Sequence, residues 1–273
     1  MINIKNKNEL DQIIKKYNFN NYDKLIINIL DKFDKFIIKF IDKLDDNIKL
    51  HYGKIINYKI NIFDEKLYNL YDFLIKCIKK ANDYMNNIYN IKYNDILNPN
   101  INIWNVYIIK NIFFNLPFTL DNVIYLPFNY LNTSFISNNT KKFIITLIHE
   151  KIHILQRLNI NLWINYIKIN YPMWIIIYNS NFLFDKLSIK NLSNYTNKKL
   201  IVNPDIDYDF KYIYSKNNKY YYSIFCLNND KIEIICFEII NKNNDIVFEL
   251  LLNNNNEYDH PFEFLAYKIS EMH

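Results

Sequence analysis

The feature that most constrains the fold is a long apolar segment from Thr140 to Leu158, which carries polar side chains at regular spacing. Its apolar residues recur at intervals of three and four and cover most of the circumference, which predicts a helix buried on nearly all sides. Asn139 or Thr140 is the expected N-cap. Polar side chains on such a helix need partners, because unpaired charge is costly to bury. The rest of the chain must therefore fold around this helix.

The polar residues in question are His149, Glu150 and His153, in the order His-Glu-x-x-His. Residues four apart lie on one helical face, so both imidazoles can reach a single metal ion. Glu150 then lies beside the position of a metal-bound water, where it can act as a general base. The pattern is typical of zinc peptidases and predicts a Zn²⁺ site. The alternative is a core helix with locally satisfied polar groups, which leaves the joint spacing unexplained.

Composition limits the class of partner. The chain has 273 residues and a net charge of +5, and its lysines are spread rather than clustered. Base readout favours arginine and Arg157 is the single arginine, so we expect no nucleic-acid partner. The most apolar stretch, 162–184, is interrupted by polar residues and a proline, so we expect no membrane span. With one glycine in the chain, asparagine is expected at left-handed backbone positions.

The chain has three cysteines without a CxxC pair. This, together with an N-terminus that lacks a signal-peptide pattern, predicts an intracellular protein with reduced thiols. Cys226 and Cys236 fall in neighbouring predicted strands, so a disulfide between them is the lesser alternative.

The order of the predicted elements indicates an α+β fold. Amphipathic helices are expected at 10–17, 22–44 and 65–89, strands at 104–114, 122–128 and several places between 212 and 252, and a short helix at 260–273. A turn is expected at 116–121, and irregular or helical structure at 167–179 around Pro172. Pro99 marks a boundary between a helical N-terminal subdomain, 1–98, and a catalytic domain, 99–273.

A catalytic zinc usually has three protein ligands, and the third does not follow the motif closely. In the extended pattern HExxHxxGxxH, Gln156 and Asn159 occupy the positions of the glycine and the last histidine. A glutamate about two dozen residues further on is also missing, because none occurs between Glu150 and Glu233. The late candidates are Glu233, Glu238, Glu249, Glu257, Asp259, His260, Glu263 and Glu271.

Among these candidates Glu263 is the predicted third ligand. It falls in the first turn of a predicted helix, because it follows Pro261 and proline is favoured at the first helical position. Ala266 is small enough to let that helix approach the motif helix closely. His260 is the alternative ligand, and the plainer interpretation of Glu263 is an acid that stabilises a helix start.

Arg157 lies about two turns after Glu150 on a similar face of the motif helix. Its planar guanidinium could orient a carboxylate near the metal or bind a substrate carboxylate, and a structural salt bridge at the helix end is the alternative.

The motif helix TLIHEKIHILQR, together with the later HPFEFLAY, resembles the zincin metallopeptidases of the gluzincin type. More narrowly, these stretches, NVIYLPFNYL and the Asn-Pro-Asp segment at 203–205 are similar to uncharacterised zinc-metallopeptidase-like proteins of large nucleocytoplasmic DNA viruses. The resemblance covers roughly residues 104–273 and leaves out the N-terminal helices. It implies a zincin-like fold, in which a small mixed sheet packs on the motif helix.

The same resemblance implies that His149, His153 and Glu263 bind Zn²⁺ and that Glu150 is catalytic in the hydrolysis of a peptide or protein substrate. It implies an oxyanion stabiliser, for which Tyr267 is the prediction and His260 and the tyrosines at 220–222 are alternatives. It also implies that the strand at 122–128 is a sheet edge that binds an extended peptide. A structural or partner-binding virion protein with little turnover is the alternative function, and a peptidase kept latent by its N-terminal helices is a third.

Overall fold

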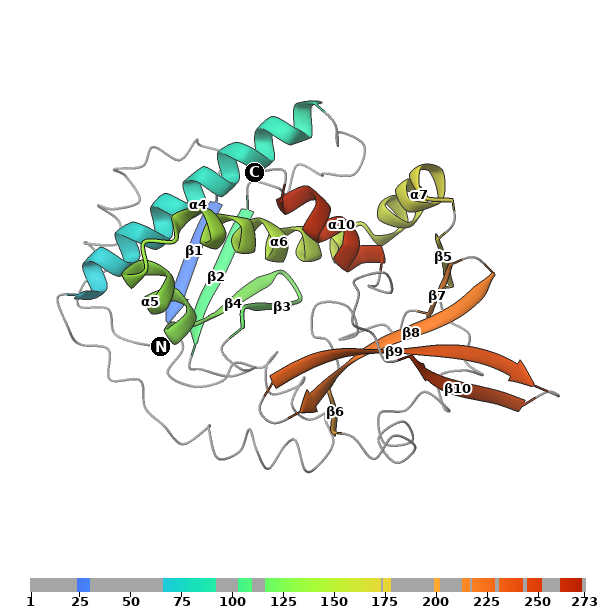
Figure 1. The fold of residues 1–273 in the computed structure, drawn as a ribbon. Coiled ribbons are helices and arrows are strands. Elements are labelled where there is room, and N and C mark those ends of the chain that lie inside the picture. The colour runs from blue at the N-terminus through green and yellow to red at the C-terminus, as the bar shows by residue number, and fades with distance from the viewer. Residues whose placement is uncertain are drawn as a thin grey trace.

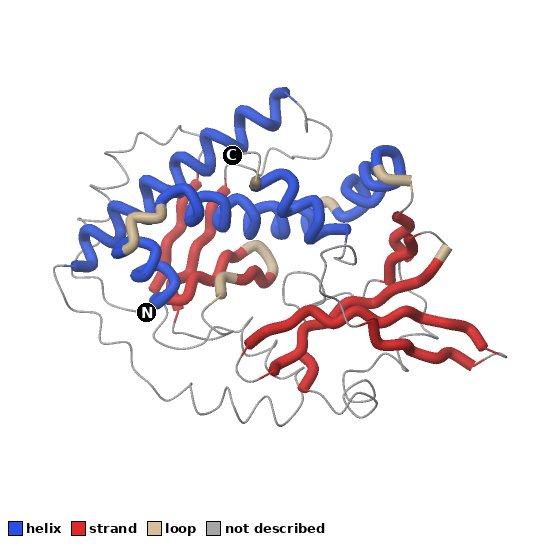
Figure 2. The backbone as a smooth tube through the Cα atoms, in the orientation of Figure 1, coloured by secondary structure: helices blue, strands red, loops and turns tan. Residues whose placement is uncertain are grey.

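In a computed structural model of the protein, helices and two β-sheets make up an α+β fold. The structure describes residues 24–29, 66–91, 103–109, 116–172, 174–177, 199–201, 213–216, 218–228, 231–242, 245–251 and 261–271. The helices α4 (Lys66–Ile91), α6 (Thr140–Leu158) and α10 (Pro261–Ser270) gather above the smaller sheet, and the larger sheet lies to one side (Figure 1). Figure 2 shows the same separation of helices and strands.

The smaller sheet has the strand order β1-β2-β4-β3. Its strands are β1 (Lys24–Ile29), β2 (Ile103–Ile109), β3 (Phe118–Leu120) and β4 (Val123–Pro127). β1, β2 and β4 are parallel, and β3 pairs antiparallel with β4. All five residues of β4 are buried, as expected for a strand in the middle of a covered sheet. The two strands predicted before the motif helix are confirmed as β2 and β4.

Of two expectations around β4, the turn holds only in part and the sheet edge is wrong. The segment 116–121 contains the strand β3, and the turn is confined to Asp121 and Asn122, with Asp121 at φ 55°. Because β4 has partners on both sides, the segment 122–128 is not a sheet edge and cannot add a peptide strand. β3 is the outer strand instead, and its three residues are buried. A strand of three residues is too short for sequence periodicity to identify.

β1 contradicts the predicted helix at 22–44 over the six residues that it occupies. A short apolar run with Ile26, Ile27 and Ile29 suits a strand, and periodicity alone does not separate such a run from a buried helix. The rest of that predicted helix and the one at 10–17 lie outside the described residues. The helix at 65–89 is confirmed as α4.

The boundary at Pro99 does not separate two cores among the described residues. β1 precedes this boundary and pairs with β2, which follows it. α4 also precedes it, and its buried residues belong to the same core as those of α6 and α10. The division into 1–98 and 99–273 stays a prediction about domains, but the described parts of both pack together.

The larger sheet has the order β10-β9-β8-β7-β5, with β6 also paired to β8, and all its pairs are antiparallel. Its strands are β5 (Trp174–Ile177), β6 (Lys199–Ile201), β7 (Ile213–Lys216), β8 (Lys219–Asn228), β9 (Lys231–Lys242) and β10 (Asp245–Leu251). The strands predicted between 212 and 252 are confirmed.

The segment 167–179 is neither irregular nor helical throughout. The helix α7 (Ile160–Asn170) ends before Pro172, and β5 begins at Trp174. Helices usually end before the residue that precedes a proline, because that residue is pushed out of the helical region. The proline therefore marks a change from helix to strand.

α6 is the centre of the core, as its apolar circumference predicts. It packs against α4, α10 and α7 and also contacts α5 (Phe128–Ile136), β3 and β4. Asn139 is the N-cap, and its side chain accepts a hydrogen bond from the backbone N–H of Lys142 at 3.4 Å. Eleven residues of α6 are buried, which confirms the prediction of a helix covered on most sides.

Three smaller predictions concern the backbone and the thiols. Asn138 and Asn218 adopt positive φ, which confirms that asparagine occupies left-handed positions in this chain. Cys77 and Cys236 are buried cysteines that form no disulfide, which contradicts the alternative of a bond between Cys226 and Cys236. Among the helices that the structure describes, none combines the length and the apolar character needed to cross a bilayer.

Candidate metal centre

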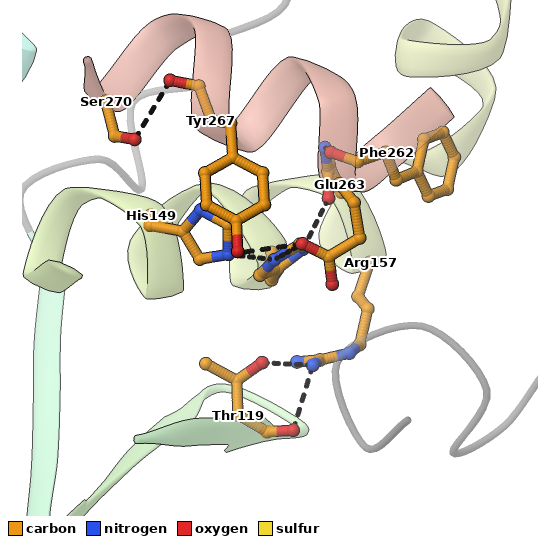
Figure 3. A network of polar contacts seen from close by, with 9 residues as sticks. Thr119, His149, Arg157, Phe262, Glu263, Tyr267 and Ser270 are labelled. Atoms are coloured by element: carbon orange, nitrogen blue, oxygen red, sulfur yellow. Dashed lines mark hydrogen bonds and ion pairs between the residues drawn. The ribbon is translucent and has the colours of Figure 1, made fainter. Parts of the chain in front are cut away.

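The candidate centre lies where α10 crosses α6. Pro261 begins α10 and places Glu263 in its first turn, as the sequence predicts. Ala266 is fully buried, together with Leu265 and Ile269. Ala266 carries only a methyl group, as expected where two helices pack closely, and the packing of α10 on α6 brings the first turn of α10 over the histidines of α6 (Figure 3).

His149, His153 and Glu263 meet at this crossing (Figure 3). Oε2 of Glu263 lies 3.3 Å from Nε2 of His149 and 3.4 Å from Nε2 of His153. The two Nε2 atoms are 3.0 Å apart. The His153 side chain is fully buried, and those of His149 and Glu263 keep 12% of their surface exposed. The structure thus brings together the three residues that were predicted as ligands.

The electrostatics of this group favour a cation. Burial raises the pKa of Glu263, but His153 and His149, when they are protonated, outweigh burial through their positive charge and their hydrogen bonds to the carboxylate, and so hold this pKa well below its ordinary value. The carboxylate is therefore ionised and can only accept hydrogen bonds, as can an imidazole nitrogen that lacks a proton. Acceptor atoms this close repel one another unless protons or a metal ion lie between them. The three residues could hold a metal ion.

Glu150 lies on α6 next to His149 and is only 4% exposed. Its negative charge reaches Tyr130, the pKa of which is raised mainly by burial and further by Glu150, against a hydrogen bond to Thr146 that lowers it. Tyr130 Oη and Thr146 Oγ1 are 2.8 Å apart. Glu150 is therefore held in a low-dielectric region next to His149, one of the three residues His149, His153 and Glu263 that we call the triad.

Tyr267 lies one turn after Glu263 on α10, on the solvent side of the centre. Its ring centroid is 4.4 Å from that of His149, and 48% of the residue is exposed. Figure 3 shows the ring lying over His149, with the hydroxyl end near the carboxylate of Glu263. Among the predicted oxyanion stabilisers whose side chains the structure describes, Tyr267 is the one that lies beside His149.

Several other candidate ligands and oxyanion stabilisers lie in the larger sheet or outside the described residues. His260 lies outside the described residues. Tyr220 and Tyr221 lie on β8 in the larger sheet, where Tyr220 is exposed and Tyr221 is buried. Glu238 on β9 forms an ion pair with Lys219 at 3.0 Å, which fits the interpretation of a partly solvated strand position.

The guanidinium of Arg157 contacts the β3–β4 hairpin, and a carboxylate partner for it, whether near the metal, in a substrate or in a salt bridge, stays a prediction. Its guanidinium donates to the carbonyl oxygens of Asp121 at 2.8 Å and Thr119 at 3.0 Å, and to the hydroxyl of Thr119 (Figure 3). Because Thr119 is fully buried, its carbonyl needs such a partner. Arg157 therefore fastens the β3–β4 hairpin to the end of the motif helix.

Gln156 contacts the centre, although the sequence marks it only as a departure from a known pattern. It is 2% exposed, and its amide hydrogen-bonds to the His153 ring and to the backbone of Phe262 at the start of α10. The sequence does contain a signal for this contact. Gln156 is an amide in a largely apolar helix, three residues after His153 and therefore about one turn further along the same face.

No family model, curated protein or solved structure matches the chain. The argument for function therefore rests on the residues of the candidate metal centre and on their geometry.

Proposed function

We propose that the protein is a zinc-dependent metallopeptidase with a zincin-like fold. The observation that carries the proposal is the convergence of His149, His153 and Glu263, with Glu150 buried next to the first histidine. In an HExxH helix the two histidines supply two ligands and the glutamate supplies a general base. A catalytic zinc has three protein ligands, whereas structural zinc has four, so a glutamate from a second helix suits the catalytic type.

The spacing of the three atoms supports zinc as the ion. With sides of 3.0, 3.3 and 3.4 Å, the point equidistant from the three atoms lies about 1.9 Å from each, close to zinc bond lengths of about 2.0–2.2 Å. Calcium needs six to eight oxygen ligands at about 2.3–2.6 Å, and magnesium prefers oxygen in octahedral geometry. Two imidazoles and one carboxylate fit neither of these ions.

The proposed reaction is hydrolysis of a peptide bond. A bound zinc ion would supply Lewis acidity, which lowers the pKa of water and polarises a carbonyl group. Glu150 would take one proton from the attacking water as the water oxygen bonds to the carbonyl carbon. It would then pass that proton to the amine nitrogen as the carbon–nitrogen bond breaks. Tyr267, half exposed over His149, would donate its hydroxyl proton in a hydrogen bond to the oxyanion.

The test of catalysis compares the wild type with Glu150→Gln, which keeps the shape of the side chain but removes the base. We expect about one bound zinc ion per chain in both proteins by elemental analysis. We expect cleavage of a mixed peptide library to fall by about 10²–10⁴-fold in the variant, which is the usual contribution of general acid–base catalysis. Equal cleavage by both proteins would show that Glu150 is not the base.

The test of the third ligand uses two glutamates of the same region. Glu263→Gln should weaken zinc binding by more than about 100-fold, because loss of an outer-shell partner alone costs about 10–100-fold. Glu271→Gln is the matched control, since Glu271 is exposed just beyond α10 and should leave zinc affinity unchanged. Unchanged affinity in Glu263→Gln would reject Glu263 as a ligand.

The remaining outcomes separate the peptidase from the alternative of a structural or partner-binding protein. Stoichiometric zinc without cleavage of any peptide in the library would favour the structural protein. Carefully prepared protein that neither contains nor takes up zinc would refute both functions.

A further inference from the structure

Gln156 lies one turn beyond His153 on α6 and is almost completely buried. Its side-chain oxygen lies 2.9 Å from Nδ1 of His153, and its side-chain nitrogen donates to the carbonyl oxygen of Phe262 at 2.9 Å. Phe262 directly precedes Glu263 and is 106 residues from Gln156 along the chain. One buried amide therefore contacts both of the segments that supply metal ligands.

We propose that Gln156 is a positioning residue, which fixes the tautomer of His153 and holds the first turn of α10, and thereby sets two of the three ligand atoms. The inference rests on the metal site of the proposed function but does not depend on peptide hydrolysis.

The carbonyl of Phe262 determines which way the amide of Gln156 faces. A carbonyl oxygen only accepts hydrogen bonds, so the NH₂ group must face Phe262 and the amide oxygen must face His153. The amide oxygen also only accepts, so Nδ1 of His153 has to carry a proton. In the neutral ring Nε2 is then unprotonated, and it lies 3.4 Å from Oε2 of Glu263. This is the tautomer that can bind a metal ion through Nε2.

The second bond of the amide places α10. Side chains from two other helices hold the backbone of α10 near its two ends: Gln156 at Phe262 O, and Tyr84 of α4 at Ile269 O, 3.1 Å away. Only the first of these bonds is adjacent to Glu263. Tyr84→Phe is therefore a matched control, because it also removes a hydrogen bond to an α10 carbonyl but leaves the bond beside the ligand.

The first measurement is the tautomer of His153 in ¹⁵N-labelled, metal-free protein, by long-range ¹H–¹⁵N correlation at a pH where the imidazoles are neutral. We expect a protonated Nδ1 in the wild type and in Tyr84→Phe. Gln156→Leu should lose this preference, because leucine offers no acceptor. Gln156→Glu should restore it, because a carboxylate oxygen accepts the same proton.

The second measurement is zinc affinity by competition with a chelating dye. We expect Gln156→Leu to bind zinc about 10–100-fold more weakly than the wild type, which is the usual effect of losing an outer-shell partner. Tyr84→Phe should unfold at a lower temperature but keep the zinc affinity of the wild type. Retained zinc affinity in a folded Gln156→Leu, or an equal loss of affinity in Tyr84→Phe, would overturn the inference.

The inference can still be tested if the leucine variant does not fold, or if the wild type proves not to be a peptidase. If Gln156→Leu does not fold, a wild-type His153 with the proton on Nε2 would still overturn it, as would Gln156→Glu without the Nδ1 proton. If the wild type binds zinc with the expected tautomer but cleaves no peptide, the peptidase is refuted and the role of Gln156 stands.

Discussion

At the scale of single residues, Lys151 is a buried cation on the face of α6 away from the triad. It is 1% exposed, its ammonium group donates to the carbonyl of Ile103, and it lies 5.4 Å from the centroid of the Trp104 ring. Trp104 in turn donates its indole N–H to Asn82 on α4 at 2.8 Å. Burial lowers the pKa of Lys151 to about 7, which shows how poorly this environment solvates a charge.

Lys151 therefore contributes to stability through its aliphatic stem more than through its charge. We expect Lys151→Met to have a free energy of unfolding equal to or above that of the wild type, because no ammonium group must be desolvated. Lys151→Ala should be less stable than Lys151→Met by about 2–5 kcal/mol, because it leaves a cavity. Urea denaturation measures both values, and an alanine variant as stable as the methionine variant would contradict this account.

Sequence reasoning at this scale depends on how far apart the partners are. The spacing of His149, Glu150 and His153 identifies them because all three lie within a turn and a half of one helix. The contact of Lys151 with Ile103 and that of Gln156 with Phe262 are invisible to such reasoning, because these partners lie 48 and 106 residues away.

At the scale of elements, the close crossing of α6 and α10 is what completes the centre. Ala266→Leu should push the helices apart and lower the free energy of unfolding by about 1–3 kcal/mol through overpacking. Zinc affinity should fall in parallel, because Glu263 moves away from the histidines. Calorimetric titration with zinc and thermal unfolding measure the two effects.

The control for that variant is Ala81→Leu, since Ala81 is also fully buried in the same core but lies on α4. It should lower stability by a similar amount and leave zinc affinity nearly unchanged. If the two leucine variants bound zinc equally well, the close crossing would not be what places Glu263.

Elements with a strong local signal are the ones that the sequence predicts correctly. α6 has an N-cap, α10 begins at Pro261, both helices have periodic apolar faces, and the strands of the larger sheet are rich in β-branched and aromatic residues. β1 and β3 are harder to predict, because each is a short apolar run whose periodicity does not separate a strand from a buried helix, and each forms a strand by pairing with β2 or β4. The same dependence on pairing explains why 122–128 was not recognisable as an interior strand.

At the scale of the whole molecule, a metal ion would join segments that are far apart in the chain. An ion that binds only the folded state raises the free energy of unfolding, by about 2.7 kcal/mol when its free concentration is 100 times Kd. We therefore expect added zinc to raise the Tm of the metal-free wild type, since it bridges α6 and α10.

The comparison for this prediction is Glu263→Gln under the same conditions, with magnesium as the control ion. The variant should show a much smaller rise in Tm with zinc, and neither protein should respond to magnesium. A rise of the same size in both proteins would mean that zinc stabilises the fold at another position.

The separation of the ligands along the chain also has a consequence for protein synthesis. His149, Glu150 and His153 are made together, but Glu263 follows His153 by 110 residues, as the numbers 263 and 153 give. A nascent chain that has reached only α6, or a fragment cut before α10, carries Glu150 and two of the three proposed ligands without the carboxylate of Glu263. In the proposed peptidase, such an incomplete chain would lack a complete zinc site and would therefore not hydrolyse peptides before α10 is made.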